Sequence, residues 1–205
     1  MSYYFDKFTD VESKELIVKS SIGGKNYSFV TDNNVFSKHS LDFGTRSLLS
    51  FLDLKAIKGD VLDFGCGYGP IGIYVKDNTD SFVDMIDINE RALSLARKNA
   101  KLNNVDVNIF SSDIYSNVNK KYDYIITNPP IRVGKKVLYE ILIGAGDYLK
   151  ECGHLIFVIN KDQGAKSVMK DITDYYNVNL IKKNKGFYVI DCQKHWLIAW
   201  NRVKL

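Results

Sequence analysis

The sequence predicts an α/β protein with a doubly wound, mainly parallel sheet of seven strands and a small N-terminal β extension. Two observations carry this prediction. From Val61 onward, strand-like and helix-like patterns alternate, as they do in βαβ units. In addition, a polar residue stands at the end of four successive strands: Asp63, Asp87, Asp113 and Asn128. Because ligands of open α/β sheets bind at the carboxyl ends of the strands, we expect the functional site there.

Length and composition exclude several classes of protein. The 205 residues suffice for one well-buried domain with a small extension, and the net charge of +4 is compatible with a nucleic-acid partner. No uncharged apolar run reaches about 18 residues, and the first residues lack the pattern of a signal peptide, so no membrane span is expected. The three cysteines show neither metal-ligand spacing nor a disulfide framework. We therefore expect a cytoplasmic protein without a metal site, and the oligomeric state stays open.

Residues 1–35 are expected to form the extension, and residues 36–205 the main domain. Strand-like residues 15–19 and 26–31 flank Gly23 and Gly24, a pattern typical of a β-hairpin. The main domain then opens with a helix that starts near Thr45 and carries a row of leucines. The hairpin is expected to pack on the main domain.

The remainder of the main domain follows the alternating pattern. Residues 61–64, 81–87, 107–110, 122–127 and 155–159 are expected to be strands because β-branched and aromatic residues dominate them. Residues 71–75, 89–103, 137–149 and 165–176 are expected to be helices, and 89–103 places its basic residues opposite its apolar ones. Gly153 is interpreted as the stop signal of the helix before it. Two last strands are expected near residues 178–181 and 196–200.

Glycines follow the first strand of the main domain at every second position, at Gly65, Gly67 and Gly69. Such a loop turns tightly and lets the backbone approach a ligand, and Pro70 suits the first turn of the next helix. A dinucleotide fingerprint is one alternative, but Pro70 stands where its third glycine belongs, and Asp63 would repel a pyrophosphate. S-adenosylmethionine, with its sulfonium, ammonium and carboxylate, suits the loop better. A purely structural turn is the remaining alternative.

The next two strand ends carry groups that suit an adenosine. Asp87 ends the second strand of the main domain, where doubly wound folds place a carboxylate on ribose hydroxyls. Ser112 and Asp113 end the third strand, and Asp113 could accept a hydrogen bond from an exocyclic adenine amine. A helix cap is the equal alternative for Asp113.

Asn128-Pro129-Pro130-Ile131 follows the fourth strand of the main domain. Two prolines cannot continue a central strand, and each holds the residue before it away from the helical region. The loop should therefore be rigid and extended, with an amide and bare carbonyls that can accept hydrogen bonds from a ligand. The alternative is a plain turn at the end of a strand.

Taken together, these motifs resemble those of the class I S-adenosylmethionine-dependent methyltransferases. Within that class the sequence is similar to the "methyltransferase small" family, whose best-known members are 16S ribosomal RNA guanine-N2 methyltransferases. The resemblance runs from Phe36 to about Val203 and includes the stretches 41–45, 131–135 and 163–167. The glycine loop marks only the superfamily, whereas the proline loop marks methylation of an amino group. The pairing of the proline loop with residues 41–45 is the most specific part.

The resemblance implies a Rossmann-like fold, S-adenosylmethionine as cofactor, and ribosomal RNA or the small ribosomal subunit as substrate. It implies cofactor contacts at Gly44, Thr45, Asp63, Gly65, Cys66, Gly67, Tyr68, Gly69, Asp87, Ile88, Ser112, Asp113 and Asn128. It also implies a catalytic loop formed by Asn128, Pro129, Pro130 and Ile131. Relatives that methylate adenine N6 or glutamine usually have an aromatic residue at the fourth position of this loop, so Ile131 favours guanine N2.

Two other functions stay open at this point. One is N-methylation of a protein amide or a small-molecule amine, and the other is a non-catalytic module that binds S-adenosylmethionine or RNA. Lysines gather in three stretches, at 135–136, 161–170 and 182–185. They would form an RNA footprint only if the fold placed them on one face.

Overall fold

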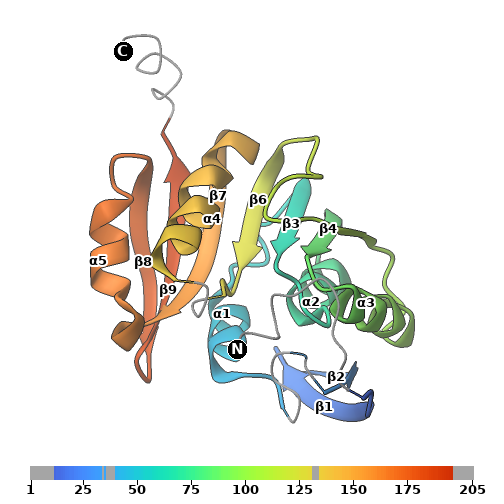
Figure 1. Cartoon of the computed structure of the whole chain (residues 1–205). Helices are drawn as coiled ribbons and strands as arrows, with labels where there is room; N and C mark the ends of the chain where they lie inside the picture. The colour runs from blue at the N-terminus through green and yellow to red at the C-terminus, as the bar shows by residue number, and fades with distance from the viewer. Residues whose placement is uncertain (1–11, 34, 36–39, 131–133, 196–205) are drawn as a thin grey trace.

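The computed structural model describes residues 12–33, 35, 40–130 and 134–195, and its centre is a seven-stranded sheet (Figure 1). Strand β9 runs antiparallel to its two neighbours, β7 and β8, and all other neighbouring strands are parallel. Side by side, the strands are β5 (Asn108–Ser111), β4 (Phe82–Asp87), β3 (Asp60–Phe64), β6 (Tyr122–Thr127), β7 (Leu149–Asn160), β9 (Phe187–Lys194) and β8 (Tyr176–Asn184). The helices are α1 (Phe43–Phe51), α2 (Pro70–Asn78), α3 (Glu90–Leu102), α4 (Lys135–Tyr148), α5 (Ala165–Asp171) and the 3-10 helix η3 (Lys161–Gln163). The predicted doubly wound α/β fold is confirmed.

The two faces of the sheet build two separate apolar cores. Successive strand residues point to opposite faces, so Ile125 packs in one core and Ile126 in the other. Helices α1, α2 and α3 cover the face of Ile126, and α4 and α5 cover the face of Ile125. Both faces of the central strands are therefore buried, as expected for a parallel sheet between helices.

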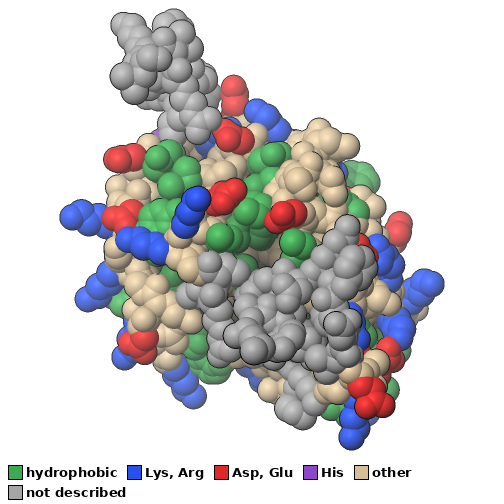
Figure 2. Space-filling model, viewed as in Figure 1, with side chains coloured by type: hydrophobic (Ala, Val, Ile, Leu, Met, Phe, Trp, Pro, Cys, Tyr) green, Lys and Arg blue, Asp and Glu red, His purple; other side chains and the backbone are tan. Residues whose placement is uncertain are grey.

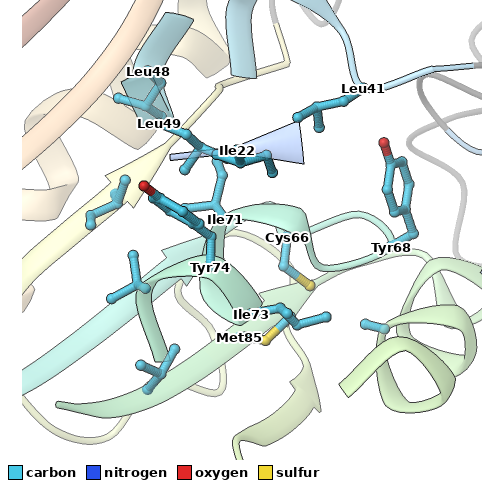
Figure 3. Packing of buried hydrophobic residues seen from close by; sticks show 14 of the residues in the cluster. Ile22, Leu41, Leu48, Leu49, Cys66, Tyr68, Ile71, Ile73, Tyr74 and Met85 are labelled. Carbon is cyan, nitrogen blue, oxygen red and sulfur yellow. The ribbon is translucent and has the colours of Figure 1, made fainter. Parts of the chain in front are cut away.

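The N-terminal hairpin consists of β1 (Leu16–Ile22) and β2 (Lys25–Thr31) and packs on the same core as α1, α2 and α3. Figure 3 shows Ile22 close to Leu49 of α1 and Ile71 of α2. The edge of β2 is held by Asn99, which is fully buried in α3: its Oδ1 accepts from Val30 N (2.6 Å) and its Nδ2 donates to Val30 O (2.9 Å). The boundary between the hairpin and the main domain at residue 35 stays a prediction.

Asn99 also links the hairpin to the glycine loop. Its Nδ2 donates to the carbonyl oxygen of Tyr68 at 2.8 Å, and the Tyr68 ring meets Phe29 of β2 edge-on, with the ring centroids 5.7 Å apart. A buried backbone carbonyl without such a donor would be costly. The hairpin therefore supports the loop that connects β3 to α2.

Two details of the prediction are wrong. Gly153 is not a helix stop. Helix α4 ends at Tyr148, and Gly153 lies inside β7, where an added Cβ would come within 3.0 Å of Lys150 O and 3.1 Å of Tyr122 O. The pairing of β6 and β7 shifts register beside it, so this glycine serves a close approach of two backbones.

The helix predicted for residues 165–176 is too long, because α5 ends at Asp171 and Tyr176 already pairs with Lys194 in the sheet. Strand β9, at Phe187–Lys194, was not predicted, and the strand predicted near residues 196–200 lies outside the described residues. Lys185 and Gly186, both with positive φ, form the tight turn that joins β8 to β9.

Candidate active site

The predicted polar residues meet at the carboxyl edge of the sheet, where the ends of β3, β4, β5 and β6 lie side by side (Figure 1). Phe64 at the end of β3 pairs with Ile86 of β4 and with Thr127 of β6, and Asp87 pairs with Ser111 of β5. The glycine loop, Asp87, Ser112 and Asn128 therefore occupy neighbouring positions of this edge.

The glycine loop between β3 and α2 adopts a conformation that other residues rarely reach. Gly65, Gly67 and Gly69 have φ values of 68°, 55° and 99°. A Cβ built at Gly65 or Gly67 would meet no described atom within 4 Å, whereas one at Gly69 would come within 2.8 Å of Met85 Cε. The backbone is thus bare toward open space at Gly65 and Gly67, while Gly69 is also required for packing against β4.

Asp63 lies beneath this loop and is fully buried. Its Oδ2 accepts from Gly72 N at 2.8 Å, in the first turn of α2, whose N-cap Gly69 has no side chain to do so. Its Oδ1 is buried and has no hydrogen-bond partner among the described residues. Burial and the nearby charge of Asp87 raise the pKa of Asp63 to about 7, against the lowering effect of the Gly72 N–H. Among the described residues, no lysine, arginine or histidine forms an ion pair with this carboxyl group.

Asp87 joins the glycine loop to the start of α3. Its Oδ2 accepts from Gly67 N (2.9 Å) and its Oδ1 from Asn89 N (2.9 Å). Burial raises the pKa of this carboxyl group, and the backbone N–H groups of Asn89, Gly67 and Ile88 oppose that rise. A carboxylate has about four acceptor positions, so the three backbone N–H groups leave one position of this half-buried side chain for a ligand.

The side chains of Cys66 and Tyr68 belong to the core rather than to the open side of the loop. Figure 3 shows both beside the apolar residues that pack under the loop, and burial raises the pKa of the Cys66 thiol well above its usual value. The thiol is therefore no nucleophile. The cofactor contacts implied for these two residues stay a prediction.

Ser112 and Asp113 lie in the turn after β5. Ser112 Oγ is buried and holds its own turn, donating to Ile114 O at 3.0 Å and accepting from Asn117 N at 3.2 Å. Asp113 is exposed, and no α-helix of the described chain begins at it, so the alternative of a helix cap is wrong. An adenine contact for Asp113 stays a prediction.

Asn128 lies directly after β6 and is held by the start of α1. Its Nδ2 donates to Thr45 Oγ1 at 3.0 Å and to Asp42 Oδ1 at 3.2 Å. Asp42 is the N-cap of α1, and the same Oδ1 accepts from Thr45 N at 3.0 Å. Pro129 is buried and Pro130 half-buried, and Ile131 lies outside the described residues. The start of α1 is thus brought against the catalytic loop expected from the sequence.

The sequence did not predict this contact. The cofactor contacts implied for Gly44 and Thr45 stay a prediction, and in the structure the Thr45 hydroxyl faces Asn128. A Cβ on Gly44 would come within 3.0 Å of Asp42 Oδ1 and 3.1 Å of Phe187 Cε1, so this glycine lets α1 approach β9. Asp42 has the residue type of an N-cap, but nothing in the sequence indicated that its carboxylate also meets Asn128.

The lysines at the two edges of the sheet differ in their partners. At the amino edge, Lys120 pairs with Asp60 and Asp84, and Lys150 pairs with Asp60 and Asp123. At the carboxyl edge, by contrast, several exposed lysines form no ion pair within the described part of the chain: Lys136, Lys161, Lys166, Lys182, Lys183 and Lys185. All three lysine stretches thus reach the edge that carries the site.

Among the described residues, no three His, Cys, Asp or Glu side chains are grouped so as to hold a metal ion. No helix in the described part of the chain has the length and apolarity needed to cross a membrane.

Comparison with known proteins gives consistent matches. The model of the family described as "Methyltransferase small domain" matches residues 26–191. Protein YbxB of Bacillus subtilis (strain 168), described as uncharacterized, is 39% identical over 197 residues, which are 94% of this chain and 98% of that protein. Ribosomal RNA small subunit methyltransferase C of Aliivibrio salmonicida (strain LFI1238) is 34% identical over 165 residues, which are 78% of this chain and 48% of that protein.

Among solved structures, the T. thermophilus 16S rRNA N2 G1207 methyltransferase (RsmC), in complex with AdoMet and guanosine, superposes with a TM-score of 0.80 at 21% identity. The match covers 91% of this chain and 52% of that chain. The chain thus spans about half the length of both ribosomal RNA methyltransferases and nearly all of YbxB.

The buried Asp63 predicts a pH-dependent stability. The unfolded chain ionises this carboxyl near 3.8, whereas the folded chain keeps the proton up to about 7. Between these values the folded state binds more protons, so its free energy of unfolding falls as the pH rises. Asp63→Asn lacks this titration. The free energy of unfolding of the variant minus that of the parent should therefore rise by up to about 1.4 kcal/mol per pH unit in this window.

Urea unfolding of ligand-free protein at a series of pH values measures this difference. Asp106→Asn, at an exposed position, is the control and should follow the parent at every pH. Parallel curves for the parent and Asp63→Asn would show that Asp63 is ionised in the folded state throughout.

Proposed function

We propose that this chain, which belongs to the methyltransferase small domain family, methylates an exocyclic amine, with guanine N2 of small-subunit ribosomal RNA as the target. Membership confirms the expected family and S-adenosylmethionine as the cofactor. The observation that carries the choice of target is the loop after β6. Asn128 there has its Nδ2 engaged by α1, which leaves Oδ1 and the carbonyl of Pro129 as acceptors on a proline-stiffened backbone.

The residues at the carboxyl edge fit S-adenosylmethionine. The buried Asp63 Oδ1 has no partner among the described residues and lies beneath a loop that is bare at Gly65 and Gly67. A bound ammonium near this carboxylate would supply a cationic partner, and the acceptor position that remains on Asp87 suits a ribose hydroxyl. When bound, S-adenosylmethionine supplies a methyl group on a sulfonium sulfur, and this sulfur keeps the electron pair of the broken S–C bond. The amine nitrogen forms the new bond to the methyl carbon and then loses a proton to water.

Asn128 and Pro129 make the amine a better nucleophile. The lone pair of an exocyclic amine is delocalised into the ring, so the flat amine is weakly nucleophilic. Two acceptors, Asn128 Oδ1 and Pro129 O, draw both amine hydrogens to fixed positions and direct the lone pair out of the ring plane. Since positioning and fixed dipoles provide the catalysis, no general base is required. To reach these acceptors, the base must leave its stack.

The lysines at the carboxyl edge support RNA as the substrate. In Figure 2, viewed as in Figure 1, Lys and Arg side chains project on the left over α5 and the β8–β9 hairpin. The ammonium groups of Lys182 and Lys185 lie over the rings of Phe51 and Phe43, both in α1. These lysines therefore lie beside the helix whose Thr45 contacts Asn128. Unpaired cations beside a site favour phosphate binding, whereas paired ones at the opposite edge stabilise the fold.

The printed names of the relatives and the loop sequence favour guanine over other amines. The relative from Aliivibrio salmonicida and the T. thermophilus structure both carry names that state ribosomal RNA methylation, and the second name states N2 of G1207. Ile131 lacks the aromatic ring expected of enzymes that methylate adenine N6 or a glutamine amide. Methylation of a protein amide or a small-molecule amine is the competing function.

The test of this function is transfer of a labelled methyl group from S-adenosylmethionine. Small ribosomal subunits, naked 16S ribosomal RNA and ribosomal proteins from a strain that lacks the gene serve as substrates. Mass spectrometry of the digested products should find N2-methylguanosine at one position. Label on protein, or on another nucleoside, would replace the proposed target.

Replacing Asn128 should separate catalysis from cofactor binding. Asn128→Ala removes one amine acceptor, so the single-turnover rate of methyl transfer should fall by about 10²–10³ while cofactor affinity, measured by calorimetry, changes little. Asn177→Ala, at an exposed position near the start of β8, is a matched control that should keep the parent rate. A parent-like rate in Asn128→Ala would contradict the proposed mechanism.

The exposed lysines should determine the salt dependence of RNA binding. The logarithm of RNA affinity should fall linearly with the logarithm of salt concentration, with a slope of about −0.7 to −0.9 per phosphate contact. Lys161→Ala and Lys185→Ala should each reduce the steepness by about one contact. Lys98→Ala, on α3, is the control that should not, because the Lys98 side chain pairs with Glu15. Equal slopes for all three variants and the parent would exclude this edge as the RNA-binding surface.

A further inference from the structure

We infer that Asp42 and Thr45 are positioning residues that fix the orientation of the Asn128 side-chain amide. This inference rests on the proposed function, because it assumes that Asn128 Oδ1 accepts from the target amine. It assigns a catalytic purpose to the start of α1, which lies more than 80 residues before the catalytic loop, since the two contacts span 86 and 83 residues.

The geometry leaves one orientation of the amide satisfied. Nδ2 of Asn128 lies 3.0 Å from Thr45 Oγ1 and 3.2 Å from Asp42 Oδ1, and a carboxylate oxygen such as Asp42 Oδ1 accepts hydrogen bonds but cannot donate them. Rotating the amide by half a turn would place Oδ1 of Asn128 against that carboxylate, two acceptors facing each other. The carboxylate therefore selects the orientation in which Nδ2 faces α1 and Oδ1 faces away from it.

That choice decides whether the loop can bind an amine. In the selected orientation, Oδ1 of Asn128 faces the target as an acceptor. In the rotated orientation, the NH₂ group would meet the NH₂ group of the target, donor against donor. An asparagine without contacts to Asp42 and Thr45 would populate both orientations of its amide, and only the orientation with Oδ1 toward the target can make the amine more nucleophilic. Asp42 and Thr45 thus preorganise the acceptor before the substrate arrives.

Asp42 is itself held in place by its role as a helix cap. Its Oδ1 accepts from Thr45 N at 3.0 Å, and Gly44 leaves room for this oxygen, since a Cβ there would lie 3.0 Å from it. The cap fixes the carboxylate relative to the Thr45 hydroxyl. One oxygen atom therefore both caps the helix and selects the orientation of Asn128.

The first test uses two pairs of variants that keep the helix start. Thr45→Val removes the hydroxyl and should slow single-turnover methyl transfer to 16S ribosomal RNA about 2- to 10-fold, and Thr45→Ser should recover most of that loss. Asp42→Ser keeps the cap but is too short to reach Asn128, so it should be slower than Asp42→Asn, which keeps both the cap and an acceptor of full length. Ser50→Ala, on the exposed side of α1, controls for disturbance of the helix.

The second test uses charge. Asn128→Asp places a carboxylate beside Asp42, so repulsion should turn its acceptor away and slow transfer strongly. Adding Asp42→Asn replaces one carboxylate with an amide, and the double variant should transfer methyl groups about tenfold faster than Asn128→Asp alone. A residue that only stabilised the fold would not restore the rate, and melting temperatures and cofactor affinities of all variants verify that the fold is kept.

The outcomes separate this inference from the function on which it rests. If Asn128→Ala is as fast as the parent, the proposed function loses its acceptor and both fail. If Asn128→Ala is slow, but Thr45→Val matches Thr45→Ser and the double variant is no faster than Asn128→Asp, the proposed function stands and the positioning role is overturned.

Discussion

The site depends on two carboxylates, Asp63 and Asp87, that accept hydrogen bonds from backbone N–H groups of the glycine loop and of the helix after it. Asp63 accepts from Gly72 N in α2, and Asp87 accepts from Gly67 N in the loop itself. A chain with three glycines at positive φ has little stiffness of its own. These bonds, together with the Asn99 bond to Tyr68 O, fix its path and leave its open side bare. The structural roles of the two carboxylates leave acceptors for a ligand, because Asp63 Oδ1 has no hydrogen-bond partner among the described residues and Asp87 keeps one acceptor position beyond its three backbone donors.

The second half of the site is organised from outside the alternating βαβ pattern. Helix α1 precedes the first strand of the sheet, yet its first turn holds Asn128 at the end of β6. The N-terminal hairpin in turn supports the glycine loop through Asn99 and the rings of Phe29 and Tyr68. Segments that precede the alternating βαβ pattern therefore position both the glycine loop and Asn128. In this account, catalysis comes from preorganised acceptors rather than from a titrating base.

Periodicity and the geometry of parallel strands made much of the fold and the site predictable from the sequence. Because parallel strands end at one edge, Asp63, Asp87 and Asn128 could be placed together without knowing the strand order. The contact of Asn128 with Asp42 and Thr45 could not be predicted, because it joins distant segments and leaves no periodic signal. Gly153 was misinterpreted because a glycine after a helical pattern looks the same whether it ends the helix or lets two strands approach. The turn at Lys185 and Gly186 was the overlooked signal for β9.

The most direct test of the central claim is a crystal structure of the protein with S-adenosylhomocysteine and guanosine. The account predicts that the exocyclic N2 of guanine lies within about 3.2 Å of both Asn128 Oδ1 and Pro129 O. It also predicts that Asn128 Nδ2 keeps its bonds to Asp42 and Thr45. A guanine bound with N2 away from these two acceptors, or an Asn128 that turns its Nδ2 toward the base, would contradict it.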